Sequence, residues 1–273
     1  MTIGTPPDSV RGMQHPWTSA LVTGASSGIG EALARQLGAA GVHMVLVARR
    51  ADRLSELAAS LRAAYGVEVE TVPADLTDRA DLERVSRRLG DPAQPIDLLV
   101  NCAGLGASGP FADGDLETYR QILALNVTAV VELSHVAMGA MATRGRGWIM
   151  NISSLGGHAP GPSFAVYSAT KAFVTSFSES LHEEGRRTGV VVTAVCPGAT
   201  VTEFGAIAGS AGDDLPKILL QSPEAVASEA LAASAKGRAV RVTGMVNRVS
   251  AAFTTVLPRS ANRKISALVT DRL

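Results

Sequence analysis

The sequence predicts an α/β fold made of one domain, in which a doubly wound parallel sheet carries helices on both faces. The first observation is that short β-prone runs alternate with longer stretches whose apolar residues recur at helical spacing. The second is a glycine-rich segment directly after the first run, where strand, tight turn and helix follow one another. The third is size, since 273 residues with 46% hydrophobic content can bury one large core.

Seven strands separated by helices are expected along the chain. The strands are expected at 18–23, 42–48, 67–73, 96–100, 148–153, 190–195 and 239–243. The helices are expected after Gly30, at 51–65, from about 77, at about 116–141, around Tyr167 and from Pro223. Gly41 and Gly66 are expected to end helices, and Ser222 to cap one.

The domain is expected at 17–245, between a loose N-terminal leader at 1–16 and a basic C-terminal extension at 246–273. From Lys236 onward there are eight basic residues and one acid, Asp271. Apolar residues of the extension, such as Val249 and Phe253, fall near one helical face, so we expect it to pack on the domain or on a partner subunit. An anionic membrane surface is the less favoured partner, because Pro258 interrupts a short apolar face. We therefore expect a homodimer or homotetramer without stable membrane contact.

Composition argues against several other classes of protein. A formal net charge of zero and 4% aromatic residues do not suggest a nucleic-acid surface. The five histidines are scattered without ligand spacing, so no metal site is expected. The leader does not read as a signal peptide, and no apolar stretch is expected to reach the ~18 residues that span a bilayer. Cys102 and Cys196 are expected to be buried thiols in a reducing compartment, which predicts a cytoplasmic protein.

The glycine-rich segment is the first candidate binding site. Its spacing is T-G-x-x-x-G-x-G, and the residues expected to contact a dinucleotide are Gly24, Ser26, Ser27, Gly28, Ile29 and Gly30. Such a turn lets the backbone approach a pyrophosphate at a helix N-terminus, where anions are favoured. Glycine turns without a ligand also occur, so the turn alone leaves both interpretations open.

The ends of the second and third strands predict the rest of the adenosine site. Ala48 stands where NAD-binding sheets carry an acid, and Arg49 and Arg50 follow, which predicts a 2′-phosphate and hence NADP(H) in preference to NAD(H). The alternative is that both arginines are a solvated helix start. Asp75, followed by Leu76, is expected either to accept a hydrogen bond from the adenine amine or to cap the next helix.

Tyr167 and Lys171 are the candidate catalytic pair, because residues four apart on a helix share a face. A phenol titrates near pH ~10, and a neighbouring ammonium is expected to lower that pKa. Ser154 leaves a central strand at its carboxyl end, where α/β sheets place ligands, and joins the pair if its loop folds back over the helix. Asn126, in an apolar helix, is either a satisfied structural amide or holds a water.

Together these segments resemble the short-chain dehydrogenase/reductase family. The matching elements are TGASSGIG at 23–30, NCAG at 101–104, Asn126, Ser154, YSATK at 167–171 and PG at 197–198. The resemblance implies a Rossmann-like sheet, an NAD(P)-dependent oxidoreductase and the catalytic set Asn126, Ser154, Tyr167 and Lys171. It also implies cofactor contacts at Asn101, Ala103, Gly104, Tyr167, Lys171, Pro197, Gly198 and Thr200. Cys102 departs from the family, which most often has a second asparagine there.

The implied reaction interconverts a ketone or aldehyde and an alcohol by hydride transfer, with Tyr167 as the acid or base. Residues 199–222 are expected to form a mobile lid over an apolar pocket, which favours a small ketone or a 3-oxoacyl chain as substrate. The competing hypothesis is a catalytically silent dinucleotide-sensing or scaffold protein of the same fold. Such a protein is expected to lack part of the catalytic set.

Overall fold

The computed structural model describes residues 15–208 and 220–270, and its centre is a seven-stranded sheet in the order β3-β2-β1-β4-β5-β6-β7. All six pairings are parallel. The strands are β1 Ser19–Thr23, β2 His43–Ala48, β3 Val69–Pro73, β4 Leu98–Asn101, β5 Gly147–Ile152, β6 Val190–Cys196 and β7 Val240–Val242. The order reverses between β1 and β4, and open α/β sheets bind their ligands at such a reversal.

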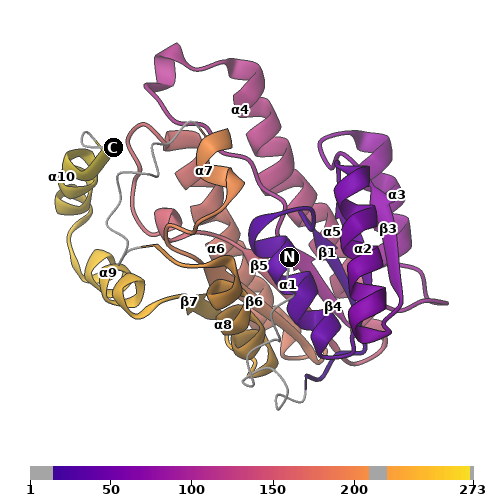
Figure 1. Cartoon of the computed structure of the whole chain (residues 1–273). Coiled ribbons are helices and arrows are strands. Elements are labelled where there is room, and N and C mark those ends of the chain that lie inside the picture. Colours follow the sequence, from indigo (N-terminus) through magenta and orange to yellow (C-terminus); the bar gives the residue numbers. More distant parts are fainter. Residues whose placement is uncertain (1–14, 209–219, 271–273) are drawn as a thin grey trace.

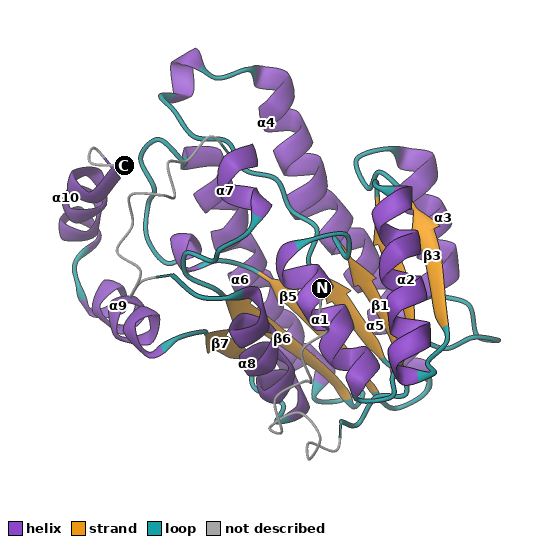
Figure 2. Ribbon diagram, viewed as in Figure 1, coloured by secondary structure: helices purple, strands orange, loops and turns teal. Residues whose placement is uncertain are grey.

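Helices cover both faces of the sheet, as predicted (Figures 1 and 2). One face packs against α1 Gly28–Ala39, α2 Ala51–Tyr65 and α8 Pro223–Ala235. The other packs against α3 Arg79–Leu89, α5 Val130–Thr143 and α6 Ala165–Gly185. Each face of the sheet has its own hydrophobic cluster, and successive strand residues point into opposite clusters. In β1, Ala20 and Val22 lie in the first cluster, with α1, α2 and α8, and Leu21 lies in the second. The Rossmann-like, doubly wound architecture is therefore confirmed.

Local signals set several of the helix ends. Gly66 ends α2 in the left-handed conformation, with φ +69°, and its N–H donates to the Arg62 carbonyl. Ser222 caps α8 by accepting the Ala225 N–H. Asp75 does not cap α3; that role belongs to Asp78, whose carboxylate accepts the Asp81 N–H. The capping alternative for Asp75 was therefore wrong.

The long helical segment between β4 and β5 is interrupted. It consists of α4 Leu116–Leu123, a π-helical turn Ala124–Ala129 and α5, where one continuous helix was predicted. By length and composition, 116–143 is apolar enough to cross a membrane, contrary to expectation. Part of this apolar segment is buried in the protein: side chains such as Leu133 and Met141 lie in the second core cluster, and 39% of the apolar window is buried.

Shorter elements complete the described chain. They are the 3₁₀ turns Phe111–Asp113 and Leu155–Gly157, α7 Glu203–Ile207, α9 Met245–Val256 and α10 Arg259–Thr270. Pro258 lies between α9 and α10, and the Asn262 amide donates to the Thr254 carbonyl at 2.7 Å, joining them. Most of the expected lid, 209–219, and leader residues 1–14 lie outside the described residues.

Candidate active site

The glycine turn is closely fitted to the ends of β1 and β4. Gly24 has φ +67°, and a Cβ there would lie 2.8 Å from the Ala103 nitrogen. At Gly30 a Cβ would lie 2.3 Å from the Gly24 carbonyl oxygen, so only glycine fits. The Thr23 hydroxyl accepts the N–H groups of Cys102 and Ala103 at 2.9 and 3.1 Å, which fixes the 101–104 segment beside the turn.

This turn leads directly into the N-terminus of α1. Ser27 precedes the helix in an extended conformation, and Gly28, with φ +57°, begins it. The first N–H groups of a helix lack intrahelical acceptors and favour anions. Ile29 packs against the first core cluster, which anchors the turn. The residues present therefore fit a pyrophosphate approaching the backbone.

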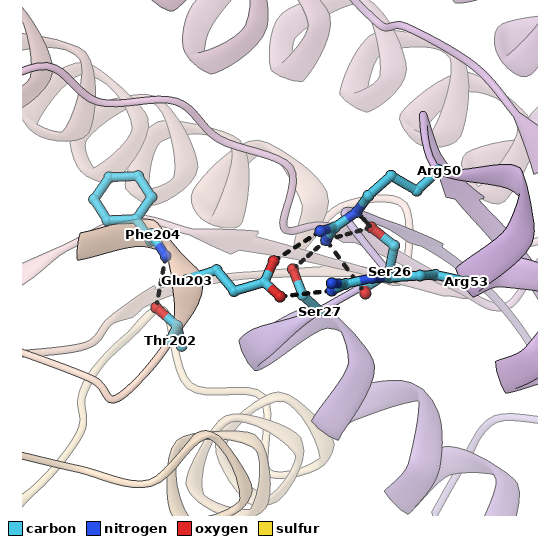
Figure 3. A network of polar contacts seen from close by, with 7 residues as sticks. All are labelled: Ser26, Ser27, Arg50, Arg53, Thr202, Glu203 and Phe204. Carbon is cyan, nitrogen blue, oxygen red and sulfur yellow. Dashed lines mark hydrogen bonds and ion pairs between the residues drawn. The ribbon is translucent and has the colours of Figure 1, made fainter. Parts of the chain in front are cut away.

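Of the two arginines expected at the 2′-phosphate, Arg50 contacts this turn and Arg49 does not. The Arg50 guanidinium donates to the Ser26 hydroxyl at 3.0 and 3.2 Å and to the Ser27 hydroxyl at 2.8 Å (Figure 3). The Arg49 side chain is 63% exposed, with Nη1 3.9 Å from the Asp75 carboxylate. Arg53, which the sequence argument missed, lies one turn along α2 from Arg50, a spacing that could have revealed it.

Two predicted cofactor residues use their side chains elsewhere. Leu76 is buried in the second core cluster, so that side chain does not face a ligand. The Asn101 amide is buried and donates to Ser134 Oγ at 3.2 Å and Asn151 Oδ1 at 2.9 Å. These two side chains are engaged within the protein, and the cofactor contacts expected at Leu76 and Asn101 stay predictions. Asp75 accepts the backbone N–H and the hydroxyl of Thr77 at 2.9 and 2.7 Å.

Ser154, Tyr167 and Lys171 meet at the carboxyl end of β5. Ser154 lies beside Tyr167, since a Cβ on Gly156 would lie 3.4 Å from Ser154 Oγ and 3.9 Å from Cε1 of the Tyr167 ring. The Lys171 ammonium lies 5.7 Å from the centre of the Tyr167 ring and donates to the Ile152 carbonyl at 2.9 Å. The loop after Ser154 folds back on α6, because a Cβ on Gly157 would lie 2.7 Å from the Lys171 backbone.

Burial sets the proton affinities of this group. It raises the pKa of Tyr167, and the nearby Ser154 hydroxyl offsets this only in part. Burial also lowers the pKa of Lys171 to about 8 and raises the pKa of the neighbouring Cys102 thiol to about 12. The expectation that Lys171 lowers the pKa of Tyr167 was therefore wrong for this structure.

Asn126 lies on the π-helical turn and is buried. Its Oδ1 accepts the Leu105 N–H at 2.9 Å, while Nδ2 donates to the Leu105 carbonyl and to Thr170 Oγ1. The amide thus holds the segment after Gly104 in place. This segment lies near Lys171, since a Cβ on Gly104 would lie 3.5 Å from Lys171 Nζ. Both Nδ2 protons have protein acceptors, so a bound water would have to donate to Oδ1.

The segment after β6 closes the site from the other side. The Pro197 carbonyl accepts the Leu155 N–H at 2.7 Å, next to Ser154. Gly198 faces Asn247 of α9 so closely that a Cβ would lie 2.3 Å from Asn247 Nδ2. Thr200 donates to the Gly198 carbonyl at 3.0 Å. Asn247 was not identified from the sequence, since nothing local marks a contact to a turn 49 positions away.

Two aromatic rings lie beside the Tyr167 ring. The Phe204 ring of α7 lies 5.3 Å from the Tyr167 ring, centre to centre, and the Phe164 ring lies 6.5 Å away. A carbonyl group reaching the phenol would therefore meet an apolar surround. Among the residues described, no cluster of three or more His, Cys, Asp or Glu side chains could hold a metal ion.

Three features define the class of protein: the parallel sheet, the glycine turn that fits a pyrophosphate where the strand order reverses, and the adjoining group of Ser154, Tyr167 and Lys171. Together they define a nicotinamide-dependent oxidoreductase. Residues 18–210 match the family model described as short chain dehydrogenase, and the chain belongs to that family.

Relatives and solved structures agree with this assignment. The chain is 36% identical over 193 residues to a very-long-chain 3-oxoacyl-CoA reductase of Anas platyrhynchos, covering 69% of this chain and 61% of that protein. It thus spans less than two thirds of that relative. A short-chain dehydrogenase from Sphingobium yanoikuyae in complex with NADPH has 35% identity and a TM-score of 0.80, with 88% and 96% of the two chains covered. The bulky-bulky ketone specific alcohol dehydrogenase from Comamonas testosteroni has 31% identity and a TM-score of 0.75, covering 89% and 95%.

Proposed function

We propose that this protein is an NADP(H)-dependent oxidoreductase that interconverts an apolar ketone or aldehyde and its alcohol. The observation that carries the proposal is the grouping of Ser154, Tyr167 and Lys171 next to the glycine turn that fits a pyrophosphate. The cofactor supplies or accepts the hydride when it is bound. The chain supplies the proton and the polar contacts.

Tyr167 is the proposed acid in reduction and the base in oxidation. Its raised pKa keeps the phenol protonated at neutral pH, which suits donation to a carbonyl oxygen. Ser154 donates a hydrogen bond to the same oxygen as negative charge develops there. Lys171 binds ribose hydroxyls with its remaining N–H groups, and Asn126 holds the neighbouring backbone in position.

A preference for NADP(H) over NAD(H) is supported by the guanidinium groups at the adenosine end. Arg50 lies on the glycine turn, Arg49 is exposed at the end of β2, and Arg53 follows on α2. A hollow of about 250 Å³ opens beside Arg53, and its lining is Ser26, Glu31, Arg35, Arg53, Glu56 and Leu57. Titration of tryptophan fluorescence with each cofactor is expected to give tighter binding of NADPH, and equal affinities would contradict the preference.

An apolar substrate is supported by the rings of Phe164 and Phe204 around Tyr167. The named relatives include a 3-oxoacyl-CoA reductase and a ketone-specific alcohol dehydrogenase. A panel of aliphatic, aromatic and 3-oxoacyl carbonyls, assayed with NADPH and NADH, tests the reaction and its substrate class together. Cofactor binding without turnover of any carbonyl would favour a silent sensor or scaffold instead.

We also propose that a catalytic unit at 17–245 assembles into a homodimer or homotetramer through its C-terminal extension. The outward face of α9 carries Met245, Val246, Val249 and Phe253, all exposed, although apolar faces are normally covered. Phe253→Asp is expected to reduce the mass measured by light scattering, while Phe111→Asp, an exposed phenylalanine elsewhere, is not. An unchanged mass for Phe253→Asp would contradict this interface.

The proposed location is the cytoplasm, without stable membrane contact. The full chain is then expected in the soluble fraction of cells and in the supernatant after sedimentation with anionic vesicles. Recovery with the vesicles would assign the α9 face to a lipid surface instead.

A further inference from the structure

Glu203, the first residue of α7, bridges two arginines of the adenosine end. Its carboxylate accepts from Arg50 Nη1 at 2.8 Å and from Arg53 Nη1 at 2.6 Å (Figure 3). Both partners lie about 150 positions earlier in the chain. The two guanidinium groups lower the pKa of Glu203 to about 2, so the carboxylate is charged throughout the physiological pH range.

The same arginines have the chemistry that a phosphate monoester requires. Arg50 also donates to the hydroxyls of Ser26 and Ser27, so two forked donors and two hydroxyl groups converge on one small region. Guanidinium forks bind carboxylate and phosphate oxygens with the same geometry. The side chains of Arg50, Arg53 and Glu203 are 38–44% exposed, so a ligand arriving from solvent can reach this region.

We propose that Glu203 is an internal competitor for the 2′-phosphate of NADP(H) and thereby tunes the choice between NADP(H) and NAD(H). This inference rests on the proposed function, since it assumes that the cofactor's adenosine end binds beside Arg50. A phosphate monoester carries a charge of about −1.5 to −2 at pH 7, so it repels the carboxylate and takes over its donors. NAD(H) has no such group, and the Glu203 ion pairs stay intact when it binds.

The test uses adenosine 2′,5′-bisphosphate and adenosine 5′-monophosphate as probes, titrated into the full-length protein by isothermal calorimetry. Glu203→Gln is expected to tighten binding of the 2′,5′-bisphosphate by about threefold to tenfold, because two exposed ion pairs no longer have to be broken. Binding of the monophosphate is expected to change less than about twofold. Glu183→Gln is the matched control, since Glu183 pairs with Arg186 at 3.1 Å near the C-terminal end of α6.

Further variants test whether Glu203 and the phosphate compete for the same guanidinium groups. In an Arg53→Gln background the gain from Glu203→Gln is expected to shrink, because one of the contested guanidinium groups is gone. Glu203→Asp keeps the charge but shortens its reach, and is expected to give an intermediate gain. It serves as the main variant if Glu203→Gln does not show a wild-type thermal transition.

The outcomes separate this inference from the proposed function. If the wild-type protein binds both probes equally, the NADP(H) preference itself is wrong. If it prefers the 2′,5′-bisphosphate and Glu203→Gln leaves that affinity unchanged, Glu203 does not compete. Weaker binding by Glu203→Gln would overturn the inference too, because Glu203 would then hold the ligand in place.

Discussion

The rings of Phe204 and Tyr167 lie 5.3 Å apart, centre to centre, with 44° between their planes. Phe204 comes from α7, beyond β6, whereas Tyr167 lies on α6. A ring in this position removes water from one side of the phenol, and burial is the main cause of the raised Tyr167 pKa. We therefore expect the proton affinity of the candidate acid to depend in part on a residue 37 positions away.

Phe204→Ala is expected to lower the Tyr167 pKa toward its ordinary value, because water then reaches the phenol. Ultraviolet titration of tyrosinate, with Tyr167→Phe subtracted from each background, measures this group alone. The affinity for apolar carbonyls is expected to fall together with the pKa. A Tyr167 pKa that does not change in Phe204→Ala would mean that the protein interior alone desolvates the phenol.

Tyr167→Phe removes the only proton that the proposed mechanism delivers to the carbonyl oxygen. We expect the turnover number to fall by about 10²- to 10⁴-fold, the usual range for loss of an acid–base group. Calorimetric affinity for adenosine 2′,5′-bisphosphate is expected to stay within about twofold, since the phenol lies at the other end of the site. Undiminished turnover would exclude Tyr167 from the chemistry.

Lys171 predicts a pH dependence of stability. Its folded pKa of about 8 lies below the unfolded value of 10.5, so between these values the unfolded chain binds more protons. The free energy of unfolding should therefore rise with pH across this window, by up to about 3 kcal/mol. Urea unfolding from pH 7.5 to 10 is expected to show this rise in the wild type relative to Lys171→Met. Parallel curves for the two proteins would contradict the inference that burying the charged Lys171 ammonium destabilises the folded protein.

Arg50 and Arg49 make different contacts, which predicts different effects on cofactor affinity. Arg50→Gln removes the guanidinium on Ser26 and Ser27 and is expected to weaken NADPH by about tenfold or more while NADH changes little. Arg49→Asp is expected to weaken NADPH less, because the Arg49 guanidinium is largely solvated. Fluorescence titration of both variants with both cofactors checks the order, and a larger loss from Arg49→Asp would reverse it.

Gly30 and Gly139 form a matched pair for the glycine turn. Gly30→Ala puts a Cβ 2.3 Å from the Gly24 carbonyl, so we expect lower thermal stability and loss of nucleotide binding. Gly139, on α5, has no atom within 4 Å of its hypothetical Cβ, and Gly139→Ala is expected to stabilise the fold by about 0.5–1 kcal/mol. Melting curves and binding of adenosine 2′,5′-bisphosphate measure both. Normal binding by Gly30→Ala would mean that the turn can relax.

Sequence patterns of short range were reliable guides to this chain. The strand runs, the Gly66 helix end and the Ser222 cap were all confirmed, because each depends on residues within a few positions of one another. Local spacing was less informative inside the 116–143 segment. Apolar periodicity does not distinguish a continuous helix from one with a π-helical turn at Asn126.

The sequence by itself determined the order of strands and helices and the residue types that such a site requires. Only the tertiary structure decided which atoms meet: Arg50 on the glycine turn, Glu203 across two arginines, and the Asn101 amide inside the core. The physical reason is that helices and strands follow from the spacing of apolar residues that are close together in the sequence. Contacts between distant segments depend instead on the register in which β1, β2, β4 and β5 pair, and on how the following loops pack over their ends.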